Sequence, residues 1–301
     1  MKTKIENLTD LIKNYYRSII YLMVPNVCNS KCFYCYIKPK FSQQSVLSKN
    51  ILRRASKIIL AAKSIGFNEF RITGGEPLIF NNISELLSIF KDNKIPYTLF
   101  TNGVNIGKYL DFFESNKPKK ITISYHSKIY HNAIFGIKYN TDLLDNYIYK
   151  LCKMDINLTI SILLLEKNKS DIVSHILYLK SLGVKSIKFI YPNQKEIKMG
   201  LKETFIDLTN QIMSIKGVEL RHSELNTNIC DMINRGFLSF PLNKSQIYGC
   251  CNSIINKMYI SDINNLNDLI KALWNFYKIA QAQKEFPCES YVEFCPIALN
   301  E

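Results

Sequence analysis

The chain has 301 residues and a mass of 34.9 kDa; 47% of its residues are hydrophobic and 21% are charged. This length can bury a sizeable core, and the composition excludes wholesale disorder, collagen-like repeats and small disulfide scaffolds. The net charge is +14, but only six of the 39 basic residues are arginine. Because lysine reads phosphate less specifically than arginine, a solvated lysine surface explains this charge best, and we expect no nucleic-acid partner.

Neither a membrane span nor a secretion signal is apparent. No run of about 18 apolar residues occurs, and residues 1–14 lack the apolar h-region of a signal peptide. We therefore expect a cytoplasmic protein with no membrane association. Nine cysteines remain to be explained, and their positions are not scattered along the chain.

Strand-like apolar runs alternate with helix-like periodic segments over the first two-thirds of the chain. We expect strands over 18–24, 69–73, 97–101, 120–125, 158–165 and 184–191, and helices over 47–65, 83–91, 141–153 and 171–182. Six such alternations predict an α/β protein with a parallel sheet buried on both faces. The sheet lies open or curls toward a barrel, and in either case the carboxyl ends of its strands form the functional rim.

The rhythm changes after Pro192. There we expect a helix over 201–215, strands over 218–222 and 257–261, and a helix over 266–281. This pattern predicts a smaller α+β domain at the C-terminus. The expected organisation is an N-terminal extension, an α/β domain and a cysteine-containing C-terminal domain, over residues 1–17, 18–194 and 195–301.

Three cysteines follow the first predicted strand with the spacing C-x₃-C-x₂-C, at Cys28, Cys32 and Cys35. Three thiols within eight loop residues of a cytoplasmic protein rarely serve packing alone. Structural zinc usually takes four protein ligands, and the nearest histidine, His126, is far along the chain. A [4Fe–4S] cube held by three cysteines instead keeps one iron open for a substrate or cofactor.

This motif, with the aromatic Tyr34 before its last cysteine, resembles that of the radical S-adenosylmethionine (SAM) superfamily. A second signature of that family follows the second predicted strand, as Gly74, Gly75, Glu76 and Pro77. The resemblance covers about residues 18–192 and implies a partial (β/α)6 TIM-type barrel. It also implies that the three cysteines hold a catalytic [4Fe–4S] cluster and that the Gly-Gly-Glu segment contacts the amino group of bound S-adenosylmethionine.

Further matches lie at the ends of later strands. Thr101 and Asn102 belong to a Thr-Asn-Gly segment that the family often carries at the cofactor site, although an Asn-Gly turn explains it equally well. Ser124 resembles the position that commonly touches the cofactor ribose. Ser161 is a second candidate, which also suits a strand hydroxyl bonded to the backbone.

A second group of cysteines lies near the C-terminus, at Cys230, Cys250, Cys251, Cys288 and Cys295. Radical SAM enzymes often carry auxiliary iron–sulfur clusters there, in modules called SPASM or twitch. We expect one auxiliary [4Fe–4S] cluster on four of these residues, with Cys250 and Cys251 competing for one position. A zinc site or free thiols are the alternatives. Cys152 is separated from both groups, and we interpret it as a thiol of the hydrophobic core.

The family resemblance implies an enzyme that cleaves S-adenosylmethionine reductively and abstracts a substrate hydrogen through a 5′-deoxyadenosyl radical. An electron donor such as flavodoxin or ferredoxin is the expected partner. The predicted substrate is a ribosomally synthesised peptide that undergoes crosslinking, epimerisation or oxidation. The alternative is a small-molecule cyclase or dehydrogenase of cofactor or natural-product biosynthesis. Four residues at or near strand ends are candidates for substrate contact: Tyr125, His126, Glu166 and Tyr191.

Overall fold

The computed structural model describes most of the first two-thirds of the chain and parts of the remainder. The described ranges are 18–35, 37–190, 219–222, 238–244, 246–248, 259–262 and 266–282, with Asp10, Ile12 and Ile215 as single residues. Cys28, Cys32, Cys35 and the Gly74–Pro77 segment lie inside these ranges. The five C-terminal cysteines lie outside them.

Ten strands of the described chain form one sheet, in the order β12-β11-β10-β1-β4-β5-β6-β7-β8-β9. Neighbouring strands from β10 to β9 run parallel, and β11 and β12 extend the sheet antiparallel beyond β10. The strands are β1 (Ile19–Met23), β4 (Glu69–Thr73), β5 (Tyr97–Thr101), β6 (Lys120–Ser124), β7 (Leu158–Leu163), β8 (Ser186–Ile190), β9 (Glu219–His222), β10 (Leu238–Pro241), β11 (Gln246–Tyr248) and β12 (Tyr259–Asp262).

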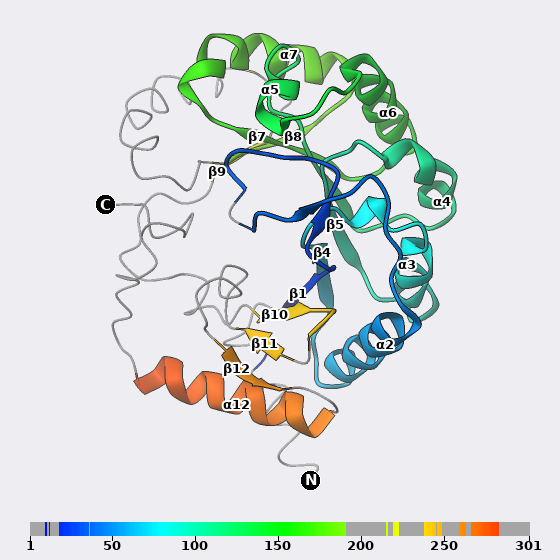
Figure 1. The fold of residues 1–301 in the computed structure, drawn as a ribbon, viewed down its shortest axis with the longest axis vertical. Helices are drawn as coiled ribbons and strands as arrows, with labels where there is room; N and C mark the ends of the chain where they lie inside the picture. The colour runs from blue at the N-terminus through cyan, green and yellow to red at the C-terminus, as the bar shows by residue number, and fades with distance from the viewer. Residues whose placement is uncertain are drawn as a thin grey trace.

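Helices cover the outer side of the curved sheet, as Figure 1 shows for α2, α3, α4, α6 and α7. The described helical segments are α2 (Lys49–Ser64), η1 (Pro77–Ile79), α3 (Ile83–Asp92), η2 (Ile106–Tyr109), α4 (Leu110–Ser115), α5 (His131–Phe135), α6 (Thr141–Lys153), η3 (Glu166–Asp171), α7 (Ile172–Ser181) and α12 (Leu266–Ala282). The right-handed crossovers expected of such strand–helix units place the helices on one side and leave the other free. This is the partial TIM-type barrel that the sequence predicts.

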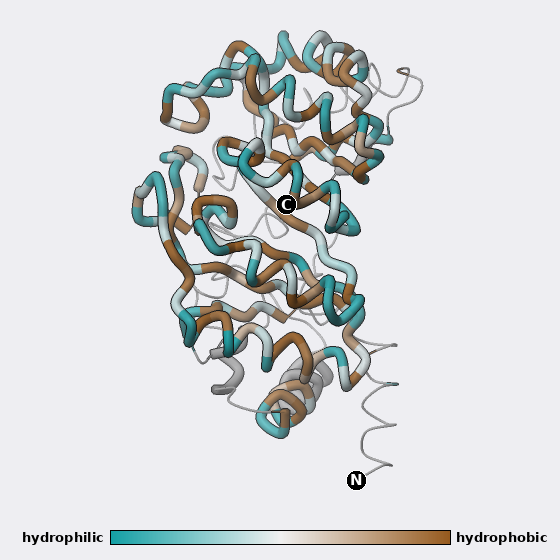
Figure 2. The backbone as a smooth tube through the Cα atoms, turned by 90° about the vertical axis from the view of Figure 1, so that its right-hand side faces the viewer, coloured by the Kyte–Doolittle hydropathy of each residue, from teal (hydrophilic) through white to brown (hydrophobic). Residues whose placement is uncertain are grey.

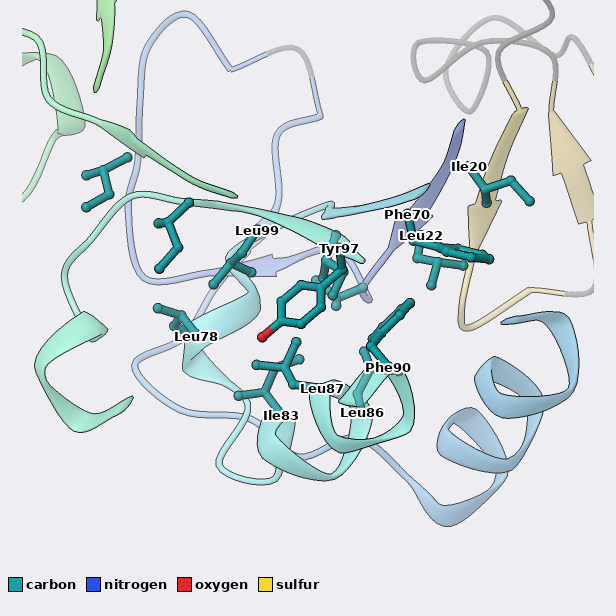
Figure 3. Close-up of a cluster of buried hydrophobic side chains, with 14 of the residues drawn as sticks. Ile20, Leu22, Phe70, Leu78, Ile83, Leu86, Leu87, Phe90, Tyr97 and Leu99 are labelled. Atoms are coloured by element: carbon teal, nitrogen blue, oxygen red, sulfur yellow. The ribbon is translucent and has the colours of Figure 1, made fainter. Parts of the chain in front are cut away.

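The core lies between the sheet and these helices. Figure 3 shows its part under β1, β4 and β5, where Phe70, Phe90 and Tyr97 pack together with aliphatic side chains of α3. Phe90 lies between the other two rings, with centroids 5.4 Å from Phe70 and 5.2 Å from Tyr97. Hydrophobic and hydrophilic residues alternate along the described helices, as expected for elements with one buried face (Figure 2).

The opposite face of the sheet is more polar than the sequence indicates. Thr122 of β6, Thr159 of β7 and Ser186 of β8 are neighbours across the sheet. Two residues further along their strands, Ser124 of β6 and Ser161 of β7 form a second pair. Strand β4 alternates buried and half-buried residues along its length, whereas β7 is buried throughout. The expectation of strands buried on both faces is therefore met at β7. At the end of β6, the half-buried Ser124 leaves a hydroxyl group accessible to a polar ligand.

The C-terminal strands join the same sheet instead of forming a second one. β10 pairs with β1 at one edge and β9 pairs with β8 at the other. The predicted strands over 218–222 and 257–261 and the helix over 266–281 appear as β9, β12 and α12. The predicted helix over 201–215 falls outside the described residues apart from Ile215. The division between residues 194 and 195 stays a prediction.

No helix of the described residues is long and apolar enough to cross a membrane. The longest, α12, spans 17 residues and carries charged side chains within its length. α2 spans 16 residues and is rich in lysine and arginine.

Candidate functional site

The cysteine loop begins just beyond β1 and is closed at its base by a short ladder. Strands β2 (Val27–Cys28) and β3 (Lys40–Phe41) pair in parallel and form their own two-stranded sheet. The Ser42 N–H donates to the Cys28 carbonyl at 2.9 Å. This ladder holds the two ends of the loop together, and the loop carries Cys32 and Cys35 between them.

The three thiols of the motif influence one another electrostatically. Cys28 is buried, and Cys32 and Cys35 are half-buried. Burial raises the pKa of the Cys28 thiol to about 11, and the negative charges of Glu76 and Cys35 add to the rise. Burial likewise raises the pKa of Cys32 to about 12, with contributions from Cys28 and Cys35. A shared cationic centre would remove this mutual repulsion and favour the thiolates.

The arrangement of the thiols differs from that of a single-ion site. Within the described ranges, no three or more His, Cys, Asp and Glu side chains converge as the ligands of one metal ion do. A tetrahedral zinc ion holds all its ligands around one point, with sulfurs about 2.3 Å from the metal. In a [4Fe–4S] cube each cysteine binds a different iron, so the sulfurs stand farther apart while facing one centre. Three thiols of one short loop that influence one another's pKa could each bind a different iron of such a cube.

The Gly-Gly turn after β4 presses directly against the start of the cysteine loop. A Cβ on Gly75 would lie 1.9 Å from the Val27 carbonyl oxygen, and one on Gly74 would lie 2.5 Å from that of Val24. Gly74 also has a φ of +124°, which disfavours any side chain. The Glu76 N–H donates to the Val27 carbonyl at 2.9 Å. Both glycines are therefore required by protein packing at this point.

Glu76 is a buried carboxylate that joins the ends of β4 and β5. It is 2% exposed. Its Oε1 accepts from the Thr101 hydroxyl at 2.6 Å and the Leu78 N–H at 2.9 Å, and its Oε2 accepts from the Asn102 N–H at 2.6 Å. Burial raises its pKa to about 7, although these three donors oppose the rise. A carboxylate offers about four acceptor positions, so one position on Oε2 remains for a further donor. Pro77, also buried, begins η1 directly after it.

Asn102 connects this carboxylate to the cysteine loop. Its Nδ2 group donates to Asn29 Oδ1 at 2.8 Å and Ser30 Oγ at 3.0 Å, and lies 3.8 Å from the Cys28 sulfur. The Ser30 N–H also donates to that sulfur at 3.4 Å. The Cys28 sulfur thus has two nearby donors, and hydrogen bonds to sulfur are one means by which proteins tune iron–sulfur centres.

The other predicted cofactor residues also lie at the carboxyl ends of strands or in the cysteine loop. Ser124 of β6 and Ser161 of β7 are direct partners across the sheet; Ser124 is half-buried and Ser161 is buried. The Tyr34 ring turns inward, and its Oη lies 2.8 Å from Nε2 of His126. Tyr125 and His126 are fully buried, so neither offers its side chain to the outer surface.

Tyr191 and the five C-terminal cysteines lie outside the described residues, as does the side chain of Glu166. Cys152 is half-buried on α6 and lies beside Gly183, whose added Cβ would be 3.1 Å from the Cys152 Cβ. It packs against the main core, as a core thiol does.

Sequence patterns did not indicate that α5 supports the cysteine loop. The Lys31 N–H donates to the Phe135 carbonyl at 2.8 Å, and Gly136, at φ +63°, lies against the Lys31 carbonyl. Four buried residues form a small apolar cluster here, against which Cys32 and Tyr34 pack: Ile134, Phe135, Leu163 and Leu165. Gly136 after a short helix is a recognisable end signal, but nothing in the spacing connects it to residue 31.

Comparison with known proteins agrees with this geometry. The sequence matches the Radical SAM superfamily over residues 22–179, which is more than half of the chain. The chain belongs to the radical SAM superfamily of enzymes. The matched range contains the cysteine loop, the Gly-Gly-Glu-Pro turn and the ends of strands β5 to β7.

The similarity to curated relatives covers only part of this chain and about a third to a half of each relative. A GTP 3′,8-cyclase of Desulforamulus reducens is 38% identical over 99 residues, which is 31% of this chain and 30% of the relative. A putative glycyl-radical enzyme activating enzyme of Methanocaldococcus jannaschii is 29% identical over 147 residues, or 40% of this chain and 54% of the relative.

Solved structures show the same fold over nearly the whole chain. Streptococcus suis SuiB bound to S-adenosylmethionine superposes with a TM-score of 0.72 at 15% identity, covering 95% of this chain and 74% of SuiB. The enzyme anSMEcpe with bound AdoMet gives a TM-score of 0.65 at 16% identity, covering 92% and 88% of the two chains. At sequence identities this low, the structural similarity supports the fold alone.

Proposed function

We propose that this enzyme holds a [4Fe–4S] cluster on Cys28, Cys32 and Cys35, binds S-adenosylmethionine beside it and abstracts a hydrogen atom from its substrate. When bound, the cluster and S-adenosylmethionine supply an electron and a 5′-deoxyadenosyl radical. The protein supplies position and exclusion of water. In this proposal the enzyme works in the cytoplasm, and a protein such as flavodoxin or ferredoxin supplies the electron to its cluster.

One observation carries this proposal: the three family signatures form a single hydrogen-bonded unit. Asn102 reaches Asn29 and Ser30 in the cysteine loop, and its N–H reaches Glu76 after the Gly-Gly turn. These segments are far apart in sequence and come from the ends of β1, β4 and β5. Coupling between them is expected if all three contact one bound group at the rim of the barrel.

The residues of this unit have separable roles. The remaining acceptor position of Glu76, together with carbonyls of the glycine turn, suits the amino group of the methionine moiety. Ser124 and Ser161, side by side on the free face of the sheet, suit the ribose hydroxyls. The apolar cluster around Phe135 packs against Cys32 in the cysteine loop and limits the access of water to it.

For the substrate we propose a ribosomally synthesised peptide. Two enzymes that share this fold over more than nine-tenths of the chain have structures with peptides: SuiB with its precursor SuiA, and anSMEcpe with the Cp18Cys peptide. The local identity of 38% to a GTP 3′,8-cyclase supports a small-molecule substrate as the second candidate. Residues 195–301, in this proposal, form a SPASM-like or twitch-like domain with an auxiliary [4Fe–4S] cluster on the C-terminal cysteines.

The cofactor part of the proposal is tested with protein reconstituted anaerobically with iron and sulfide. With dithionite, wild-type protein should convert S-adenosylmethionine to 5′-deoxyadenosine, measured by chromatography. The variants Cys28→Ala, Cys32→Ala and Cys35→Ala should each lose this conversion because a cluster ligand is gone. Cys152→Ala is the matched control, since this thiol lies on α6 away from the site, and should retain it. Conversion that persists in the three loop variants would show the assignment to be wrong.

The substrate class is tested by stimulation of the same conversion. A short peptide encoded next to the gene should accelerate 5′-deoxyadenosine formation and emerge with an altered mass. Deuterium placed in that peptide should appear in the 5′-deoxyadenosine. Stimulation by GTP, with no effect of the peptide, would favour the small-molecule candidate.

A further inference from the structure

The cysteine loop turns its thiols and its neighbouring side chains in different directions. Cys28 is buried, and Cys32 packs against the apolar cluster beside α5. Lys31 and Phe33, which stand on either side of Cys32, are both exposed, and Phe33 is 52% exposed. The chain therefore places an exposed residue directly before and directly after a predicted cluster ligand.

The second arm of the loop adds exposed residues to the same surface. In the ladder between β2 and β3, Phe41 is the partner of Cys28, and Lys40 is the partner of Val27. Both β3 residues are exposed. The Lys31 ammonium lies 4.6 Å from the centroid of the Phe41 ring, so the two arms meet at this point. The exposed residues of the two arms form a surface that we call the exposed loop face: Lys31, Phe33, Lys38, Lys40 and Phe41.

The positive charge of this face is not balanced by neighbours in the sequence. From residue 18 to residue 68 the chain holds eight lysines and arginines and no aspartate or glutamate. The ion pairs found among the described residues involve Arg71, Lys119 and Lys128, and none of the three lysines of the exposed loop face. A group of like charges without counterions in the fold raises the local potential and attracts an acidic surface.

Aromatic rings bordered by charged groups are typical of a contact surface. A single exposed apolar side chain needs no explanation, but Phe33 and Phe41 belong to one loop and are bordered by lysines. Aromatic residues are enriched at the centres of protein interfaces, and their rims are polar. A small face of this kind suits the complexes of electron-transfer proteins, which bury less than about 1,200 Å².

The position of the face favours an electron donor over the substrate. Phe41 pairs with Cys28, and Phe33 follows Cys32 directly, so a protein docked here comes within one residue of two predicted cluster ligands. The substrate of the proposed function instead meets the 5′-deoxyadenosyl group, and the hydroxyls proposed for the ribose of that group lie on β6 and β7.

We propose that the exposed loop face docks an acidic one-electron carrier protein and thereby receives the electron for the cluster. The inference rests on the proposed function, because it takes Cys28, Cys32 and Cys35 as the cluster ligands. Carboxylates of the partner face the three lysines of the loop. The reduced partner loses one electron and this enzyme gains it at the cluster, with no bond formed or broken. Charge attraction of this kind acts mainly on the rate of association.

The first test follows electron transfer from an acidic flavodoxin in its hydroquinone form to reconstituted protein, by anaerobic stopped-flow detection of the flavodoxin semiquinone. The triple variant Lys31→Gln/Lys38→Gln/Lys40→Gln should slow this transfer about 10-fold at low salt, because the steering charge is lost. No slowing in this loop variant would overturn the docking face.

The matched control removes the same charge from the opposite edge of the sheet. Three exposed lysines lie in the last turns of α3, α6 and α7, from which the chain returns to the amino ends of the next strands: Lys91, Lys150 and Lys180. The triple Lys→Gln variant at these positions should keep a rate near that of wild type. Slowing equal to that of the loop variant would show that the total charge, and not the exposed loop face, controls the transfer, and would overturn the proposal.

Salt gives a second measurement that needs no variant. Between about 0.01 M and 1 M salt the Debye length falls from about 30 Å to about 3 Å, so the wild-type rate should fall steeply. The loop variant should depend less on salt, and the two rates should converge at high salt. A wild-type rate that does not change with salt would overturn the proposal, whether or not the loop variant binds iron well.

Dithionite separates failure of the docking face from failure of the proposed function. This small reductant needs no docking, so excess dithionite should fully reduce the loop variant, and its iron content should match that of wild type. Wild-type protein that takes up no iron would overturn the proposed function together with the docking face. A loop variant that keeps the wild-type rate with flavodoxin but no longer binds the substrate peptide would assign the face to the substrate, and would overturn the docking face alone.

Discussion

His131 is fully buried, and neither of its ring nitrogens has a hydrogen-bond partner. Its ring stacks on Phe135 with centroids 4.2 Å apart and meets Tyr125 edge-on at 5.0 Å. Burial, followed by the nearby His175, lowers the pKa of His131 from its usual 6.5 to about 3. The residue therefore packs as a neutral aromatic ring, and its unpaired nitrogens reduce the stability of the fold.

We predict that His131→Phe makes the protein less sensitive to acid. The unfolded chain takes up a proton at His131 near pH 6.5 and the folded protein does so only near pH 3, so wild-type stability falls as the pH drops through this window. One such group costs about 1.4 kcal/mol per pH unit within the window. Urea unfolding of the apo-protein at pH 7.0 and 5.5 measures this loss. His131→Phe should lose less than wild type; an equal loss in both would contradict the prediction.

At the level of elements, the close approach of the Gly-Gly turn to β2 positions the cysteine loop. A Cβ at residue 75 would meet the Val27 backbone, which cannot move aside as a side chain can. We predict that Gly75→Ala displaces Val27 and the adjoining Cys28, lowers stability by about 3 kcal/mol and reduces iron uptake. Thermal unfolding and iron analysis measure the two effects.

Gly107→Ala is the matched control for this variant. A Cβ there would also be too close to a neighbour, at 2.2 Å, but that neighbour is the Tyr147 ring, a side chain that can rotate. Its cost should be about 1 kcal/mol, and iron uptake should be unchanged. If both alanine variants behave alike, the packing of the turn on β2 does not control the cysteine loop.

The elements of the barrel were predictable from the sequence because each strand and helix carries its own apolar period. The ranges 69–73, 97–101 and 141–153 match β4, β5 and α6 residue for residue. The Gly-Gly-Glu-Pro and cysteine motifs were found because their residues are adjacent in the chain. Strand β10, by contrast, is four residues long, and only its pairing with β1 and β11 distinguishes it from a loop.

Contacts between distant segments were not predictable in the same way. The sequence pointed to Asn102 at a turn but not to its bonds with Asn29 and Ser30, some 70 residues earlier. His126 was a candidate for substrate contact, and the structure instead buries it between Tyr34 and Leu163. Such pairings arise from the order of strands in the sheet, which spacing along the chain does not encode.

At the scale of the whole molecule, the C-terminal part of the chain returns to the first strand. β10 pairs in parallel with β1, and the Leu242 N–H donates to the Met23 carbonyl at 2.8 Å. Helix α12 also contacts α2. Figure 1 shows β10, β11 and β12 beside β1 at this edge. The described C-terminal elements, β10 to β12 and α12, therefore lie next to the strand that leads into the cysteine loop.

The last prediction concerns that second group. We expect reconstituted wild-type protein to bind about eight irons, as two four-iron cubes require. Replacing Cys288 and Cys295 together by Ala should remove about half of this iron and spare 5′-deoxyadenosine formation, because the ligands of the barrel cluster all lie between residues 28 and 35. Cys152→Ala should retain all of it. About four irons in wild-type protein, unchanged in the double variant, would exclude the auxiliary cluster and leave electron removal from the substrate radical to another acceptor.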